Sequence, residues 1–263
     1  MRKLIFVALF AAFMAPLPSS AQSGFDGTWK VDVQSAQFPT KPDVYLLQNG
    51  TFECKTCVPP ISVKADGQDH PVSGHPYYDT VNIKIVDDHT MIETDKKNGK
   101  TVTVGKNTVS PDGKTLNFEF TDSSNSSGAP VTGKGSATRV DAGPVGSHAL
   151  SGSWRMTKLE NISSNGVTFT YKVDGDTLHM SSPTGQSYSA KLDGTDAPYK
   201  GDPGVTSVSV KRIDKNTIEE TDKRDGKPIS VARITLSADG KTLNVTSRDL
   251  LAGTSASFSA AKQ

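Results

Sequence analysis

Four side chains of types that bind metals or exchange electrons lie within a short stretch of the chain. They are Cys54, Cys57, His70 and His75. Their spacing matches the ligand set of a two-Cys, two-His zinc finger. A finger needs its histidines on a helix, and Pro71, Gly74 and Pro76 forbid a regular helix there. The finger is excluded, while a zinc ion held on a loop by the same four ligands stays an alternative.

The two cysteines alone favour a local disulfide. Covalent haem attachment would need a histidine where Val58 stands. A redox pair would need a thiolate stabilised by a helix N-terminus or a cation, and here the motif lies between strand-like and proline-rich segments. Residues three apart in a flat strand point to opposite faces. The Cys54–Cys57 disulfide therefore predicts a turn or bulge at Lys55 and Thr56.

Tyr77 and Tyr78 follow His75 directly. Loops on a rigid scaffold commonly carry binding residues, so these three are candidates for contacts to a ligand. The alternative is that the two tyrosines only cover one end of a domain.

Paired carboxylates form the other candidate for chemistry. Glu93 and Asp95 share a strand face by their spacing, as do Glu220 and Asp222, and such pairs can do acid–base work. The lysine that follows each pair favours a solvated, charged strand end instead. The sequence has no nucleophile elbow, phosphate loop or metalloprotease helix. We therefore expect no catalytic residues, no enzyme activity and no cofactor.

Much of the sequence occurs twice. Glu93-Thr94-Asp95-Lys96 recurs as residues 220–223, and residues 112–117 recur as residues 239–244. A repeat of this length indicates a domain duplication. Features that both copies share describe architecture, whereas the Cys–His–Tyr stretch belongs to the first copy alone and is the better place to seek function.

Both copies consist of strand-like segments. Asn-Gly or Asp-Gly pairs punctuate them, and such pairs favour two-residue hairpins. Between the turns apolar and polar residues alternate, as in Val81–Ile85 and Val167–Val173, which is typical of antiparallel strands with one buried face. A proline- and glycine-rich segment shared by the copies, Asp66–Pro76 and Asp193–Pro203, is expected to be an irregular structural loop rather than a calcium site.

The fold class is predicted to be all-β, with two tandem antiparallel up-and-down barrels of about eight to nine strands each. A two-sheet sandwich is the alternative. The expected divisions are a signal peptide at 1–21, repeat one at 22–140, a linker at 141–149 and repeat two at 150–263. The signal peptide has a basic start, an apolar stretch and a small-x-small cleavage site, so we expect a periplasmic or extracellular protein.

Each copy begins with a glycine two residues before a tryptophan. These segments, Gly27-Thr28-Trp29 and Gly152-Ser153-Trp154, resemble the G-x-W signature of the lipocalin-like (calycin) families. The resemblance implies a ligand-binding barrel closed at one end by the tryptophan, with an arginine of the last strand packed across it. Arg139 lies near the end of repeat one and fits that role.

Composition narrows the function further. The formal net charge of +1 gives no electrostatic basis for binding nucleic acid, and after signal cleavage we expect no integral membrane association. The resulting prediction is a binding protein for a small apolar or amphipathic ligand. A structural or interaction module of the cell envelope without a ligand is one alternative, and a metal or redox protein using Cys54 and Cys57 is another.

Overall fold

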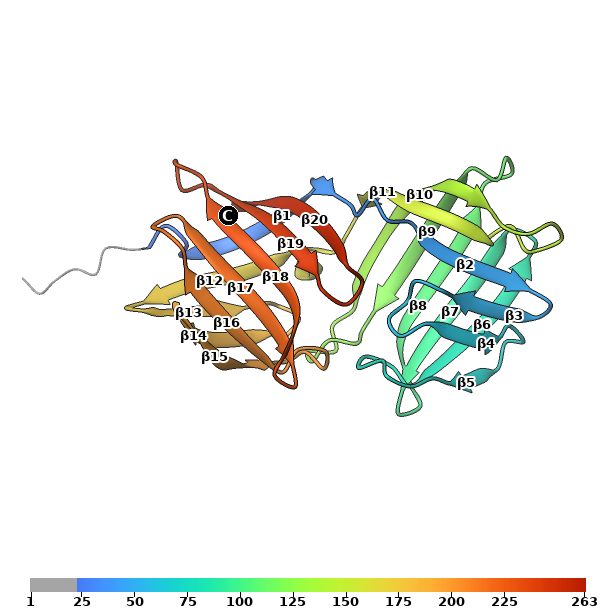
Figure 1. The fold of residues 1–263 in the computed structure, drawn as a ribbon, viewed down its shortest axis with the longest axis horizontal. Helices are drawn as coiled ribbons and strands as arrows, with labels where there is room; N and C mark the ends of the chain where they lie inside the picture. Colours follow the sequence, from blue (N-terminus) through green and yellow to red (C-terminus); the bar gives the residue numbers. More distant parts are fainter. Residues whose placement is uncertain (1–22) are drawn as a thin grey trace, which may run out of the picture.

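The computed structural model describes residues 23–263, which form two lobes side by side (Figure 1). The predicted signal peptide lies outside the described residues. One three-residue 3-10 helix, η1 (Ser164–Gly166), interrupts a fold otherwise built of strands. No helix among the described residues has the length and apolar character needed to cross a membrane.

Ten strands form the sheet of one lobe, called here the N-terminal lobe. They are β2 (Asp43–Gln48), β3 (Thr51–Cys54), β4 (Ile61–Lys64), β5 (Asp69–Pro71), β6 (Thr80–Asp87), β7 (Thr90–Lys97), β8 (Lys100–Val109), β9 (Thr115–Asp122), β10 (Val131–Ala142) and β11 (Gly152–Glu160).

Ten more strands form the sheet of the other lobe, called here the C-terminal lobe. They are β1 (Gly27–Gln37), β12 (Thr168–Asp174), β13 (Thr177–Ser181), β14 (Ser187–Lys191), β15 (Asp193–Lys200), β16 (Ser207–Arg212), β17 (Thr217–Arg224), β18 (Lys227–Leu236), β19 (Thr242–Asp249) and β20 (Thr254–Lys262).

The all-β prediction is confirmed, with differences in detail. All pairings within both sheets are antiparallel, and the C-terminal sheet closes into a barrel. The N-terminal sheet is barrel-like but stays open, because β4 and β5 lie at its two edges. Each sheet has ten strands rather than eight or nine, partly because the shared segment predicted to be irregular contains β5 and β15.

Most of the Asn-Gly and Asp-Gly pairs lie in hairpin turns as predicted. Asp66-Gly67 instead joins β4 to β5, which lie at opposite edges of the sheet, and Asp193-Gly194 lies within β15. At Asn49-Gly50, Asn98-Gly99 and Asp225-Gly226 both residues have positive φ, between 51° and 77°. Glycine reaches this region without a steric cost, and Asn and Asp tolerate it. These turns connect sequential strands, which is why neighbours in the chain are mostly neighbours in the sheet.

The first strand of each repeat lies in the sheet of the other repeat. Strand β1 pairs with β12 and β20, placing Trp29 opposite Lys262. Strand β11 pairs with β10 and β2, placing Trp154 opposite Arg139. The sheets therefore do not follow the repeat boundaries. The N-terminal lobe is one continuous segment, 43–160, and it is inserted between β1 and β12 of the C-terminal lobe.

Each lobe has its own apolar core. Trp29, Leu178 and Leu243 are fully buried in the C-terminal lobe, and Trp154 and Ile83 are fully buried in the N-terminal lobe. Apolar burial of this kind is the main favourable term in folding. The exchanged tryptophans make each core depend on a residue from the other repeat.

Candidate functional site

The predicted disulfide is present. Cys54 and Cys57 are bonded to each other, and the chain bends at Lys55 and Thr56 as expected. The bond removes two ligands from the zinc alternative. His70 is engaged elsewhere, with Nε2 at 2.8 Å from Asp66 Oδ1. No group of three or more His, Cys, Asp or Glu side chains suited to a metal ion occurs within residues 23–263.

Both tryptophans close their lobes in the same way. Trp29 Nε1 donates to Phe25 O at 2.9 Å, and Trp154 Nε1 donates to Leu150 O at 2.8 Å. A cation lies over each ring. Lys262 Nζ is 5.0 Å from the Trp29 ring centroid, and the Arg139 guanidinium carbon is 4.0 Å from that of Trp154. Arg139 thus packs across the tryptophan of repeat two, because the first strands are exchanged.

The closed sheet of the C-terminal lobe forms the wall of a partly open cavity of about 330 Å³. Its walls carry apolar and aromatic side chains from strands all around the barrel, together with a few small polar groups near η1 and the β13–β14 loop. The lining residues are Val31, Asn165, Gly166, Val167, Thr168, Phe169, Tyr171, Met180, Ser182, Thr184, Gln186, Tyr199, Glu220, Ala232, Ile234, Val245 and Phe258.

Glu220 is the one acidic side chain among these lining residues. Its Oε2 accepts a hydrogen bond from Tyr188 Oη at 2.5 Å. Burial, with a smaller contribution from the charge of Asp222, raises the pKa of Glu220 to about 8, and the bond from Tyr188 opposes this shift. At neutral pH the cavity of the free protein therefore holds mostly a protonated carboxyl group.

The expectation of a solvated strand end at the paired carboxylates is wrong. Met91 is fully buried, and its strand face also carries Glu93 and Asp95, the latter only 7% exposed. Lys96 points to the opposite face, where its Nζ lies 2.6 Å from Asp69 Oδ2. Burial raises the pKa of Glu93 to about 8 and that of Asp95 to about 7.

The same arrangement recurs in repeat two. Ile218, Glu220 and Asp222 share the inward face of β17, and Lys223 pairs with Asp196 outside the barrel. Because alternate residues of a strand face opposite sides, the lysine that suggested a solvated strand end cannot reach the carboxylates. Asp95 Oδ1 and Asp222 Oδ1 are buried and have no hydrogen-bond partner in the described part of the chain.

A second cavity, of about 460 Å³, lies between the lobes. Residues of the N-terminal lobe (Tyr77, Tyr78, Thr103, Asp122, Ser124, Asn125 and Val131) line it together with Gly166, Thr184, Gln186, Gly201, Asp202 and Pro203. Three of these residues, Gly166, Thr184 and Gln186, also line the barrel cavity. The two cavities therefore adjoin at the mouth of the closed barrel.

The tyrosines singled out from the sequence lie at this junction. Tyr77 Oη donates to Asp202 Oδ1 at 2.9 Å, and a Cβ atom on Gly204 would come within 2.3 Å of the same hydroxyl. Tyr78 stacks on His75, with ring centroids 4.7 Å apart. Tyr77 thus fixes one lobe against the other, while contact of Tyr77, Tyr78 or His75 with a ligand stays a prediction.

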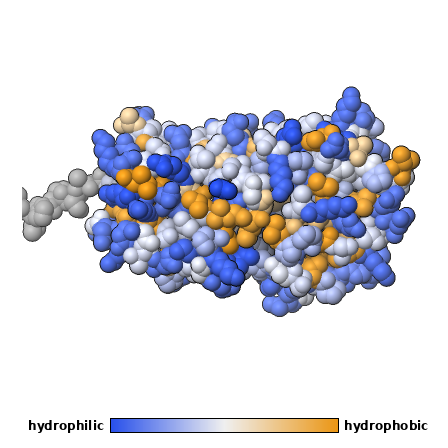
Figure 2. Space-filling model, in the orientation of Figure 1, coloured by the Kyte–Doolittle hydropathy of each residue, from blue (hydrophilic) through white to orange (hydrophobic). Residues whose placement is uncertain are grey.

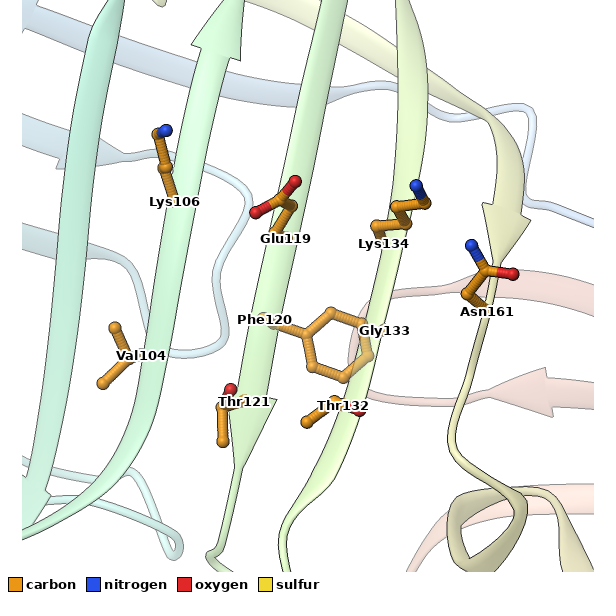
Figure 3. Close-up of a pocket in the computed structure, with 9 residues that line it drawn as sticks. All are labelled: Val104, Lys106, Glu119, Phe120, Thr121, Thr132, Gly133, Lys134 and Asn161. Atoms are coloured by element: carbon orange, nitrogen blue, oxygen red, sulfur yellow. The ribbon is translucent and has the colours of Figure 1, made fainter.

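A third hollow, on strands β8 to β10, is less suited to an apolar ligand (Figure 3). It is wide open to solvent, and Lys106, Glu119 and Lys134 form a row of alternating charge across these strands. The Phe120 ring lies against Gly133, where a Cβ atom would come within 2.8 Å of it.

Apolar residues also gather on the surface in the middle of the molecule, where the lobes meet (Figure 2).

The sequence interpretation missed Tyr171, Tyr188 and Tyr199 because it sought function in the residues peculiar to repeat one. The signal was present in the alternation of Val167–Val173, which puts Tyr171 on the apolar face. Comparison of the strand pairings shows that repeat two has a tyrosine at a position where repeat one has an isoleucine. Tyr188 pairs with Met180 where repeat one pairs Ile61 with Cys54.

No protein-family model and no curated protein sequence matches this chain. The fold and the cavity define an all-β protein with two barrel-like antiparallel sheets, one of them closed around a largely apolar interior.

Proposed function

We propose that this protein binds a small apolar or amphipathic molecule inside the closed sheet of its C-terminal lobe. The observation that carries the proposal is the barrel cavity of about 330 Å³, lined mainly by apolar and aromatic side chains around one carboxyl group. Cavities of this size, mostly apolar with few polar groups, are typical of small-molecule sites. The G-x-W segments and the meander of strands support a lipocalin-like binding protein.

We place this function in the periplasm or outside the cell. The Cys54–Cys57 disulfide is of the kind that persists in oxidising compartments, and the sequence of residues 1–21 has the pattern of a signal peptide. Such a protein would carry or sequester its ligand rather than transform it.

Calorimetric titration with 1-octanol tests the proposal, because this alcohol is neutral and has an apolar chain. We expect binding with a dissociation constant on the order of 10–100 µM. Ala232→Phe places a ring in the cavity and should abolish binding. Thr246→Phe adds the same ring on the exposed face of β19 and should leave binding unchanged. Failure of the wild-type protein to bind, or full binding by a folded Ala232→Phe variant, would refute the proposal.

A further inference from the structure

We infer that the barrel cavity selects organic cations, namely amines with an apolar body, whose ammonium group takes Glu220 as its counter-ion. This inference rests on the proposed function and adds the chemical class of the ligand. It follows from the charges, the free hydrogen-bonding positions and the aromatic walls of the cavity.

The cavity wall is acidic and has no basic side chain. Among the residues that line it in the described part of the chain, Glu220 is accompanied by no Lys, Arg or His. Nearby basic groups are engaged elsewhere. Lys223 pairs with Asp196, and Arg224 Nε donates to Gly204 O at 2.8 Å. An anionic ligand would therefore meet a carboxyl group without any compensating cation.

Once it is ionised, Glu220 has an acceptor position to spare in the cavity. Glu220 Oε2 accepts from Tyr188, and no residue of 23–263 donates to its Oε1. Asp222, two residues further along the strand, does not line the cavity; its Oδ2 accepts from Ser230 at 2.8 Å, and its buried Oδ1 has no partner within residues 23–263. Buried carboxylates are normally paired or fully hydrogen-bonded. An ammonium group supplies up to three donors and a positive charge, and either would satisfy the free oxygen of an ionised Glu220.

Aromatic rings surround the same space. Phe169 and Tyr171 meet edge to face with centroids 5.0 Å apart, and Tyr199 lies 5.6 Å from Tyr188. The face of an aromatic ring attracts a cation, and more strongly where water is excluded. The rings thus favour a ligand with an apolar body and a cationic head group, whereas the ring faces do not attract an anionic head group.

Repeat one lacks this arrangement. It keeps the carboxyl group at Glu93, but Ile61 takes the place of Tyr188 in the strand pairing. Tyr45 and Tyr78 lie near Glu93, but among the described residues neither phenol donates to Glu93 as Tyr188 donates to Glu220. The cation site belongs to the C-terminal lobe.

Three ligands of equal chain length distinguish a preference for cations from the general binding of apolar molecules that we propose. We would titrate the protein at pH 6.5 with octylamine, 1-octanol and octanoate. Octylamine should bind about tenfold more tightly than octanol, since charge-assisted hydrogen bonds are the stronger ones, and octanoate should bind most weakly. Equal affinity for octylamine and octanol would overturn the inference and leave the proposed function standing. Absence of binding by all three would overturn both.

Glu220→Gln keeps the size of the side chain and its bond from Tyr188 but removes the charge. It should bring octylamine to the affinity of octanol and change octanol by less than about twofold. Glu219→Gln removes the same charge from the other face of β17 and serves as the matched control. Retention of the amine preference by a folded Glu220→Gln variant would overturn the inference.

Proton release gives an independent readout. Because Glu220 is mostly protonated in the free protein at pH 6.5, capture of an ammonium ion should release up to about one proton to the buffer. The groups facing it are Asp222, which titrates with it, and Tyr171, Tyr188 and Tyr199, whose pKa values are raised by burial so that they stay neutral. Titrations in two buffers of different ionisation enthalpy measure this release, which should vanish by pH 9. Release that is absent at pH 6.5, or unchanged at pH 9, would contradict the inference.

Discussion

Glu93 and Glu220 occupy equivalent positions in the two repeats, and burial raises the pKa of both to about 8. The unfolded chain loses these protons near the ordinary value of 4.5 for glutamic acid. Between these two pH values the folded protein binds more protons than the unfolded one. Stability must therefore fall as pH rises through this window.

We predict that the protein is more stable near pH 5.5 than near pH 8. Each such group lowers the free energy of unfolding by up to about 1.4 kcal/mol per pH unit within the window. Urea unfolding at the two pH values measures the difference, and Glu220→Gln should reduce it. A wild-type protein equally stable at both values, or a variant with unchanged dependence, would show that these carboxyl groups are not buried.

Arg139 and Lys262 occupy matching places over the two tryptophans but make different contacts. Arg139 Nη2 donates to Ala149 O at 2.5 Å and Nη1 donates to Ser151 O at 2.6 Å, whereas Lys262 Nζ donates to Gly24 O at 3.1 Å. We predict that Arg139→Ala costs about 2–3 kcal/mol of stability and Lys262→Ala about 1 kcal/mol. Chemical denaturation compares them, and an equal or reversed order would contradict this account of the closing residues.

At the scale of elements, the exchange of first strands is the feature that sequence could not predict. β1 and β11 carry the same Gly-x-Trp pattern and the same alternation, so either strand satisfies the local requirements of either sheet. Which strand joins which sheet depends on the lengths of the links between neighbouring strands. β11 follows β10 after a short link and pairs with it as a hairpin, which leaves β1 to close the sheet of repeat two. Alternation and most of the hairpin turns are local properties, and these were predicted correctly.

Engineered cysteines test the exchange. Lys30 lies opposite Ala261 on β20, whereas closure within one repeat would place it opposite Thr138, the partner of Arg155 in the N-terminal lobe. All three positions are exposed. We predict that the Lys30→Cys, Ala261→Cys pair cross-links under oxidation and that the Lys30→Cys, Thr138→Cys pair does not. Peptide mapping by mass spectrometry identifies the bond, and the opposite result would place β1 in the sheet of its own repeat.

The candidate site was only partly predictable, because sequence shows local properties of a strand but not how its sheet closes. Tyr77 and Tyr78 were visible as loop residues peculiar to one copy, and they do line the cavity between the lobes. The burial of Glu220 was not visible, because Lys223 beside it in the chain lies outside the closed sheet. Whether a carboxyl group on a strand is buried depends on how the sheet closes, and this is a property of the whole sheet.

At the scale of the whole molecule, a cavity between the two lobes adjoins the cavity of the barrel. The barrel cavity and the cavity between the lobes share Gly166, Thr184 and Gln186. Tyr77 of one lobe is bonded to Asp202 of the other beside this junction. Under the proposed function, a ligand would pass the N-terminal lobe on its way to the barrel cavity, and the duplication would contribute to binding.

A crystal structure with a bromine-labelled ligand tests the central claim most directly. We would soak crystals with 8-bromo-1-octanol and locate the bromine by anomalous scattering. We predict one bromine peak inside the closed sheet of β1 and β12–β20, among the rings of Phe169, Tyr171 and Phe258. A peak confined to the outer hollow of β8–β10, or no peak in crystals whose barrel is open to solvent, would contradict it.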